Sequence, residues 1–273
     1  MEDTKMLNYV KDVLENMPTD WLNLTTHRLD IYDENLAKTK FLEQFETLCN
    51  TNNSDVTALH ELQTAYDYIR LGHPLSCILE WAIAHLNNIK PENVISFSSK
   101  TIPILAILRK NLLDHKNTQI VYTGELPTFF DAELLRNIYG YQFELKHIKK
   151  VADISEFNGS TIFVSQETTI NANDLNSNID FFINIYEHLG SVLLVNGEQN
   201  ERYISEIQHV RRRETIAMTP ANSLTALQSL VNKSPFNIPT NDLETNKKIV
   251  LDTITSITGA DTKPLVGSSG LSI

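Results

Sequence analysis

Val94-Ile-Ser-Phe97 begins a series of short apolar runs that decides the fold. Between these runs lie longer segments whose apolar residues recur at helical spacing, so strands and helices alternate along the chain. Runs with almost no polar residue fit strands that are covered on both faces of a sheet. The other runs are 120–122, 143–148, 161–164 and 191–195, and the helices between them are predicted at 101–114, 130–139 and 178–189.

This alternation predicts the α/β class, with a mainly parallel sheet flanked by helices. Ligands of such sheets bind beyond the carboxyl ends of the strands. Further helices are predicted at 3–17, 35–50, 75–86 and 240–258. We therefore divide the chain into a helical N-terminal segment (1–60), an α/β domain (61–235) and a C-terminal helix with a flexible tail (236–273).

Composition indicates a folded globular protein, because 41% of the 273 residues are hydrophobic and 21% are charged with both signs mixed. The formal net charge of −11 disfavours nucleic acid as a partner, since binding to phosphate backbones needs clustered lysine and arginine. The basic run Arg211-Arg212-Arg213 is interpreted as a solvated turn or helix face.

Cellular location is inferred from the cysteines and from the N-terminus. Cys49 and Cys77 are isolated, which favours neither a disulfide framework nor a zinc site and is typical of the reducing cytoplasm. The sequence has no apolar run of about 18 residues and its N-terminus does not resemble a signal peptide, so we expect neither export nor a membrane partner.

The common phosphate-binding and metal-binding motifs are missing from the sequence. The chain has only nine glycines and contains no G-x-G-x-x-G, no G-x-x-x-x-G-K-[ST] and no H-E-x-x-H. Dinucleotide and P-loop chemistry therefore have no support, and no metal site is predicted.

Several weaker phrases stand in an order that matches a known family. Tyr68-Ile-Arg70-Leu-Gly72-His-Pro74 is followed by Phe97-Ser98-Ser99, then by Val164-Ser-Gln-Glu-Thr-Thr169, and then by the stretch from Asn178 to Val195. In this order they resemble phrases of the cystathionine synthase/lyase family, the trans-sulfuration branch of the fold-type-I pyridoxal-phosphate enzymes. The resemblance runs from about 60 to 221, so the C-terminal domain of such an enzyme would be mostly missing.

The resemblance implies a set of cofactor-binding positions. Tyr68 and Arg70 match the pair that reaches the cofactor phosphate across a dimer interface, and Ser99 falls in the phosphate turn. Asn196 matches the aspartate that pairs with the pyridine nitrogen. An amide cannot stabilise a protonated ring as a carboxylate does, so these four positions are interpreted as vestigial.

The same resemblance implies that the reactive groups have been lost. Lys100 replaces the glycine of the phosphate turn, and Leu126 falls where the family has the ring that stacks on the cofactor. The position of the Schiff-base lysine falls at Pro220 or Ala221, and no lysine occurs between Lys150 and Lys233. Neither Pro220 nor Ala221 can form an imine, so no catalytic residue is nominated.

Two functions remain open from the sequence. The preferred one is a pseudoenzyme that keeps the family's fold, takes no cofactor and acts as an interaction or regulatory subunit, as a homo-oligomer or with a protein partner such as an active paralogue. The alternative is a divergent pyridoxal-phosphate lyase or transferase of sulfur amino-acid metabolism, with Lys100 as the amine.

Overall fold

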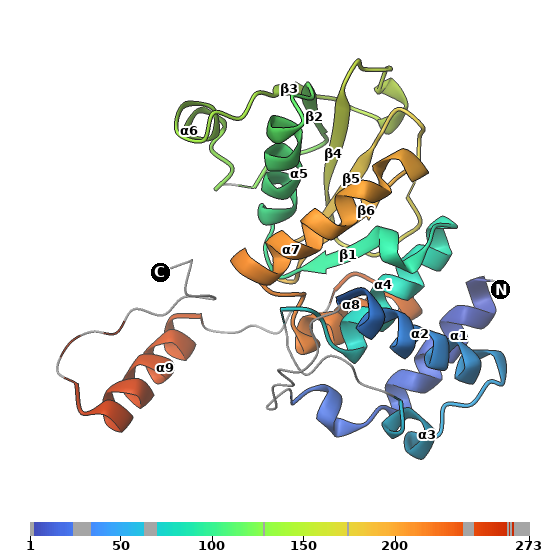
Figure 1. Ribbon diagram of the computed structural model, residues 1–273. Helices are drawn as coiled ribbons and strands as arrows, with labels where there is room; N and C mark the ends of the chain where they lie inside the picture. Colours follow the sequence, from blue (N-terminus) through green and yellow to red (C-terminus); the bar gives the residue numbers. More distant parts are fainter. Residues whose placement is uncertain are drawn as a thin grey trace.

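The computed structural model gives an α/β fold in which helices cover both faces of one sheet (Figure 1). It describes residues 3–23, 34–62, 70–127, 129–173, 175–236, 243–260, 262 and 264. Most of the predicted tail, and Tyr68 among the candidate residues, lie outside these described residues.

The sheet has six strands in the order β1-β6-β5-β4-β2-β3. Five of these strands run in one direction, and β6 runs antiparallel to its neighbours β1 and β5. The predicted mainly parallel sheet is therefore confirmed. The strands are β1 (Val94–Phe97), β2 (Thr118–Tyr122), β3 (Glu144–His147), β4 (Ser160–Glu167), β5 (Phe181–Tyr186) and β6 (Gly190–Val195).

The helix predicted at 178–189 is wrong, because this segment contains strand β5. Its sequence Phe-Phe-Ile-Asn-Ile-Tyr consists mostly of aromatic and β-branched residues, which favour strands. All six residues are buried, so the polar face that a surface helix would need is missing. A turn of three residues, 187–189, then joins β5 to β6, and a connection this short forces β6 to run antiparallel.

The helices form a layer on each face of the sheet. Helices α5 (Ile102–Leu113) and α7 (Ile204–Glu214) pack together on one face. The other face is covered by α4 (Pro74–Asn87), on which α8 (Pro220–Asn232), α1 (Asp3–Asn16) and α2 (Glu34–Asn50) pack. The remaining helices are α3 (Val56–His60), α6 (Ala132–Asn137), α9 (Leu243–Thr258) and the 3-10 turns Thr19–Trp21, Pro91–Asn93, Val151–Asp153 and Glu198–Tyr203.

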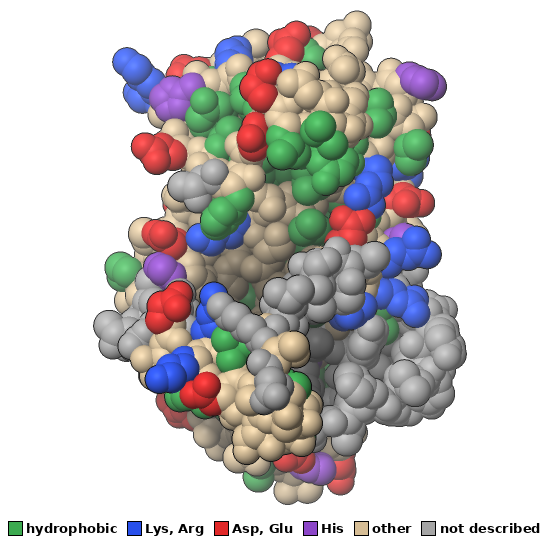
Figure 2. All heavy atoms as spheres, turned by 90° about the vertical axis from the view of Figure 1, so that its left-hand side faces the viewer, with side chains coloured by type: hydrophobic (Ala, Val, Ile, Leu, Met, Phe, Trp, Pro, Cys, Tyr) green, Lys and Arg blue, Asp and Glu red, His purple; other side chains and the backbone are tan. Residues whose placement is uncertain are grey.

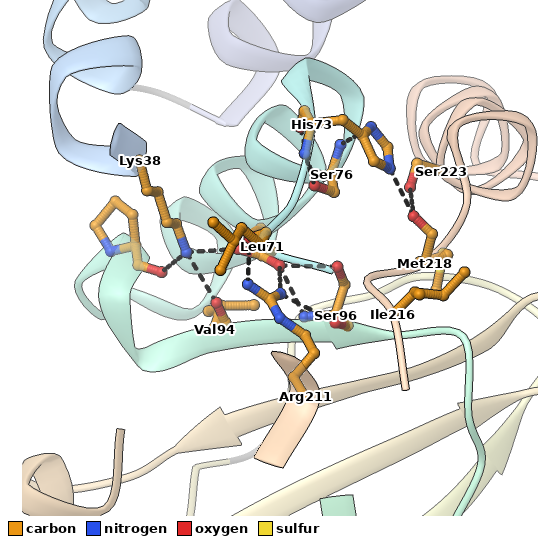
Figure 3. Close-up of polar contacts among 12 residues, drawn as sticks. Lys38, Leu71, His73, Ser76, Val94, Ser96, Arg211, Ile216, Met218 and Ser223 are labelled. Carbon is orange, nitrogen blue, oxygen red and sulfur yellow. Dashed lines mark hydrogen bonds and ion pairs between the residues drawn. The ribbon is translucent and has the colours of Figure 1, made fainter. Parts of the chain in front are cut away.

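A buried ionic network joins the sheet to both helical layers (Figure 3). Glu80 of α4 lies 2.5 Å from Lys38 Nζ of α2 and 3.1 Å from Arg211 Nη1 of α7. The main-chain N–H and the hydroxyl of Ser96 in β1 each donate to Glu80 Oε1 at 2.8 Å. Burial alone would raise the pKa of Glu80, but the two cations and these hydrogen bonds lower it below its usual range.

The basic partners of Glu80 also bind main-chain carbonyls. Lys38 Nζ donates to Pro91 O and Val94 O, and Arg211 donates to Leu71 O and Ser96 O. Arg211 is only 4% exposed, so our interpretation of the run 211–213 as a solvated face is wrong for its first residue. A buried guanidinium is stable here because a carboxylate and two carbonyls replace its water.

His73 links the start of α4 to the start of α8 (Figure 3). Its Nδ1 accepts from the Ser76 N–H at 3.2 Å, which caps α4, and its Nε2 donates to Met218 O at 2.7 Å. Both ring nitrogens are thus occupied by the neutral form, and burial lowers the pKa of His73 to about 4.

Both cysteines are buried, and neither forms a disulfide. Burial and the nearby charge of Glu80 raise the pKa of Cys77 to about 12. Among the described helices, none is long and apolar enough to cross a bilayer.

Replacing Glu80 by glutamine should lower the free energy of unfolding by about 3–5 kcal/mol, because it leaves two buried cations without their anion. Urea unfolding followed by circular dichroism measures the effect. Glu133→Gln is the control, since Glu133 pairs with Arg136 on the surface and should cost less than about 0.5 kcal/mol. Equal costs for both variants would contradict a central role of the network.

His73 should make the protein less stable in mild acid. The unfolded histidine takes up a proton near its usual pKa of 6.5, whereas the folded one does so only near 4. The stability that neutral His73 provides is therefore present above about pH 6.5 and lost as the pH falls to 4. Between pH 7 and pH 4 the wild type should lose about 3 kcal/mol more than His73→Asn, which keeps a capping acceptor but does not titrate. Identical pH dependence of their urea midpoints would contradict this role.

Candidate functional site

A cleft of about 270 Å³ lies at the carboxyl ends of the parallel strands. This is the edge where the sequence predicts a ligand site. Its lining residues come from the segments that follow β1, β2 and β5 and from the end of β4. They are Lys100, Glu125, Leu126, Pro127, Phe129, Gln166, Ile185 and Glu187.

The cleft carries charges of both signs. Lys100 stands between β1 and α5, and Glu125 and Glu187 follow β2 and β5. In the part of the chain that the structure describes, Lys100 is the cation that lines the cleft. Gln166 donates through Nε2 to the main-chain oxygen of Glu125, which ties the loop after β2 to the end of β4. The arrangement suits a ligand that has an anionic group for Lys100.

Apolar side chains form the rest of the lining. Ile185 is buried at the end of β5, while Phe129 is 73% exposed. The sequence led us to expect no aromatic ring here because Leu126 takes the expected position. Phe129, three residues further along, supplies one. A flat ligand could stack on this ring.

The turn between β5 and β6 is held in an unusual backbone conformation. His188 has a φ of +67°, which is uncommon for a residue with a side chain. The Leu189 N–H donates to Tyr186 O at 3.1 Å, and Asn222 Nδ2 donates to Leu189 O at 3.0 Å. Gly190 is required because a Cβ there would lie 2.1 Å from Phe97 O. The turn is thus fixed to β1 and α8, and it fixes Glu187 at the cleft.

Ser99 lies next to the cleft, but its hydroxyl is hydrogen-bonded at the start of α5. Ser99 Oγ accepts at 3.3 Å from the N–H of Thr101, the residue before α5, and at 3.1 Å from the N–H of Ile102, the first residue of α5. Its carbonyl accepts from Ser191 Oγ at 2.6 Å. A helix N-terminus whose N–H groups are already bonded has less capacity to bind a phosphate.

Asn196 is not brought to the cleft. It follows β6, which runs antiparallel to β5. Asn196 therefore lies at the end of the sheet opposite the carboxyl ends of the parallel strands. There its Nδ2 donates to the carbonyls of Asn176 and Ile179. The sequence interpretation took 178–189 for a helix, so it did not predict the short turn that makes β6 antiparallel.

Among the described residues, the candidate positions Arg70, Pro220 and Ala221 do not line the cleft either. Arg70 Nη1 lies 3.5 Å from Arg212 O near the end of α7. Pro220 is the first residue of α8, where Thr219 caps the helix by accepting from the Asn222 N–H at 3.3 Å. Ala221 is exposed on the same helix. Of the positions considered from the sequence, the structure places Lys100 and Leu126 in the lining of the cleft, with Ser99 next to it.

The sequence interpretation missed Glu125, Gln166 and Glu187. Two other glutamates near strand ends serve elsewhere, because Glu201 pairs with Lys90 and Glu167 does not line the cleft. Glu187 was missed because it lies within 178–189, which was wrongly predicted to be a helix. Within the described ranges, no group of three or more His, Cys, Asp or Glu side chains could hold a metal ion.

No protein-family model and no curated protein matches the chain significantly. Among solved structures, metB from Corynebacterium glutamicum matches at 13% identity, covering 74% of this chain and 61% of that one, with a TM-score of 0.41. Cystathionine gamma-lyase from yeast matches at 15% identity, covering 63% and 54%, with a TM-score of 0.44.

A third match is an O-acetylhomoserine (thiol)-lyase, metY, from Campylobacter jejuni with N'-pyridoxyl-lysine-5'-monophosphate, at 14% identity, 60% and 58% coverage and a TM-score of 0.33. The chain spans 54–61% of the length of these three structures. At such identities the likeness concerns the fold alone.

The expectation that the protein takes no cofactor needs correction. The third matched structure holds a pyridoxyl group attached to a lysine, so the expectation of no cofactor is not kept.

The cleft residues meet part of what this cofactor requires. Pyridoxal phosphate presents a phosphate, which needs a cation or free N–H groups, and an aldehyde, which needs an amine for covalent attachment. Among the described lining residues Lys100 can serve one of these groups, not both, and the Ser99 hydroxyl already occupies the N–H groups of Thr101 and Ile102 at the start of α5. No catalytic step therefore follows from this set of residues.

Ser99→Ala should lower the free energy of unfolding by about 1 kcal/mol, because α5 loses its capping acceptor. Chemical denaturation checks the value. Ser155→Ala is the matched control at an exposed position and should have an effect within about 0.5 kcal/mol of zero. If Ser99→Ala is equally neutral, Ser99 does not serve as the cap and its hydroxyl is available to a ligand.

Proposed function

We propose that the chain is a non-catalytic interaction or regulatory subunit with a fold like that of the pyridoxal-phosphate transferases. The observation that carries this proposal is which lysine side chains line the cleft. Lys100 is the lysine that lines it in the described part of the chain, and Pro220 and Ala221 stand where the resemblance requires the reactive lysine. Without an amine for the aldehyde and a separate cation for the phosphate, covalent amino-acid chemistry lacks its starting groups.

The proposed role leaves the cleft available for ligand binding. Lys100, the two glutamates and the exposed ring of Phe129 are suited to hold a small anionic ligand, pyridoxal phosphate included, without turning it over. A bound ligand would contact segments from four strands at once, so its presence would stabilise this edge of the sheet. We place this role in the cytoplasm, with a second copy or an active paralogue as partner.

The second candidate is a divergent pyridoxal-phosphate lyase or transferase acting on sulfur amino acids. Lys100 favours it, because its side chain lines the cleft at the ligand edge and makes no hydrogen bond or ion pair with any described residue. In that case Lys100 would be the covalent attachment point, and the phosphate would need a cation from a partner.

Turnover and labelling distinguish the two candidates. The purified chain is incubated with pyridoxal phosphate and sulfur amino acids, and release of thiol and ammonia is measured, followed by borohydride reduction and peptide mass spectrometry. Under our proposal the wild type and Lys100→Ala are equally inactive. Turnover by the wild type that falls at least about a hundredfold in Lys100→Ala, together with a pyridoxyl adduct on Lys100, would establish the second candidate and refute the first.

A further inference from the structure

Strand β3 forms a free edge of the sheet. It pairs with β2 on one side, and no other described strand pairs with its outer side. All four of its residues, 144–147, are exposed. A free edge presents unpaired N–H and C=O groups that can receive another strand.

The outward groups of β3 can be identified from the ladder with β2. The Ile148 N–H donates to Tyr122 O at 3.0 Å, so the main-chain groups of Ile148 point inward. Successive residues of a strand direct these groups to alternate edges, and those of Leu145 and His147 therefore point outward. Arg136 Nη2 donates to Phe143 O at 3.1 Å, so this outward carbonyl is already bonded and the proposed pairing uses the outward groups of Leu145.

We propose that β3 pairs with β3 of a second copy of this chain, antiparallel, with the two-fold axis at Leu145. In this arrangement Leu145 exchanges both of its main-chain hydrogen bonds with Leu145 of the other copy. The pairing joins two six-stranded sheets into one continuous sheet.

Charge selects this register over its neighbours. With the axis at Leu145, Glu144 of each copy faces Lys146 of the other, which gives two attractive cross-strand pairs. Moving the axis by one residue to Glu144 or to Lys146 places like charges directly opposite each other. If the axis passed between two residues, main-chain groups that point outward in one copy would face groups that point inward in the other. The hydrogen bonds between the two strands would then not form. The charges of Glu144 and Lys146 thus match those of a second antiparallel copy when the axis passes through Leu145.

Exposed apolar side chains also occur on and after α6, whose Arg136 bonds to Phe143 next to β3. Leu145 shares a sheet face with Ile120, its partner in β2. Leu134 of α6 is exposed, and so are Ile138 and Tyr139, the two residues that follow α6. Ile138 is 74% exposed. Figure 2 shows hydrophobic side chains gathered near the top of the face, on the part of the molecule that carries α6 and β3 in Figure 1. Association along β3 would remove apolar surface of this kind from water.

The inference does not depend on the proposed function, because it uses no residue of the cleft. Self-association through β3 and turnover at Lys100 are measured separately, so the failure of one leaves the other standing.

Sedimentation velocity of the whole chain over a range of concentrations tests the proposal. The wild type should form a dimer, and Lys146→Glu should weaken it about tenfold or more, since both cross-strand pairs become repulsive. The double variant Glu144→Lys with Lys146→Glu restores opposite charges and should recover the dimer. Lys149→Glu, an exposed charge beyond the strand, is the control and should leave association unchanged. Circular dichroism confirms that each variant is folded.

Crosslinking tests the position of the axis. Paired residues at the axis have Cα atoms about 5.5 Å apart, within the range of about 4.4–6.8 Å that a disulfide spans. Leu145→Cys should therefore give a covalent dimer on mild oxidation, while Lys149→Cys should not, because its two copies would lie about 27 Å apart. The native cysteines are buried and should not interfere. A wild type that stays monomeric at all concentrations, or a dimer that resists Lys146→Glu and does not crosslink through position 145, would overturn the proposal.

Discussion

The carboxylate of Glu80 is the interaction on which the architecture depends. It accepts from Lys38 of α2, from Arg211 of α7 and from Ser96 of β1, so one buried anion holds the two helical layers to an outer strand of the sheet. Such a group is costly to bury without partners, and here several donors surround it. Since Lys100 and the start of α5 follow β1 directly, the position of β1 in this network also fixes one side of the cleft.

Much of the fold follows from local sequence, and what does not follow has a physical reason. Strands such as Val94–Phe97 and helices such as Pro74–Asn87 have unambiguous apolar patterns. The segment Phe181–Tyr186 does not, because a short run that is apolar throughout has no periodicity that separates a buried strand from a buried helix, although its residue types favour a strand. Because this strand was missed, the antiparallel course of β6 and the position of Glu187 were not predicted.

Local sequence also fails where burial depends on distant partners. The arginine run 211–213 has the composition of a surface, yet Arg211 is buried because Glu80 lies 131 positions earlier in the chain and directly beside it in space. The cleft shows the same limit. Its place at the carboxyl ends of the strands could be predicted from the alternation of strands and helices, and Lys100 from the family resemblance, whereas Phe129, Glu125 and Gln166 gather there only through the course of the loops. Proximity between residues far apart in sequence is a property of the packed chain that spacing rules do not capture.

The burial of Cys77 has a practical consequence. Its thiol lies on α4 one turn before Glu80, and burial together with that neighbouring charge suppresses the thiolate, the form that reacts with alkylating reagents. Modification of this sulfur therefore requires α4 to lift away from the sheet. The rate at which a reagent such as iodoacetamide reacts with Cys77 would report how often α4 separates from the sheet.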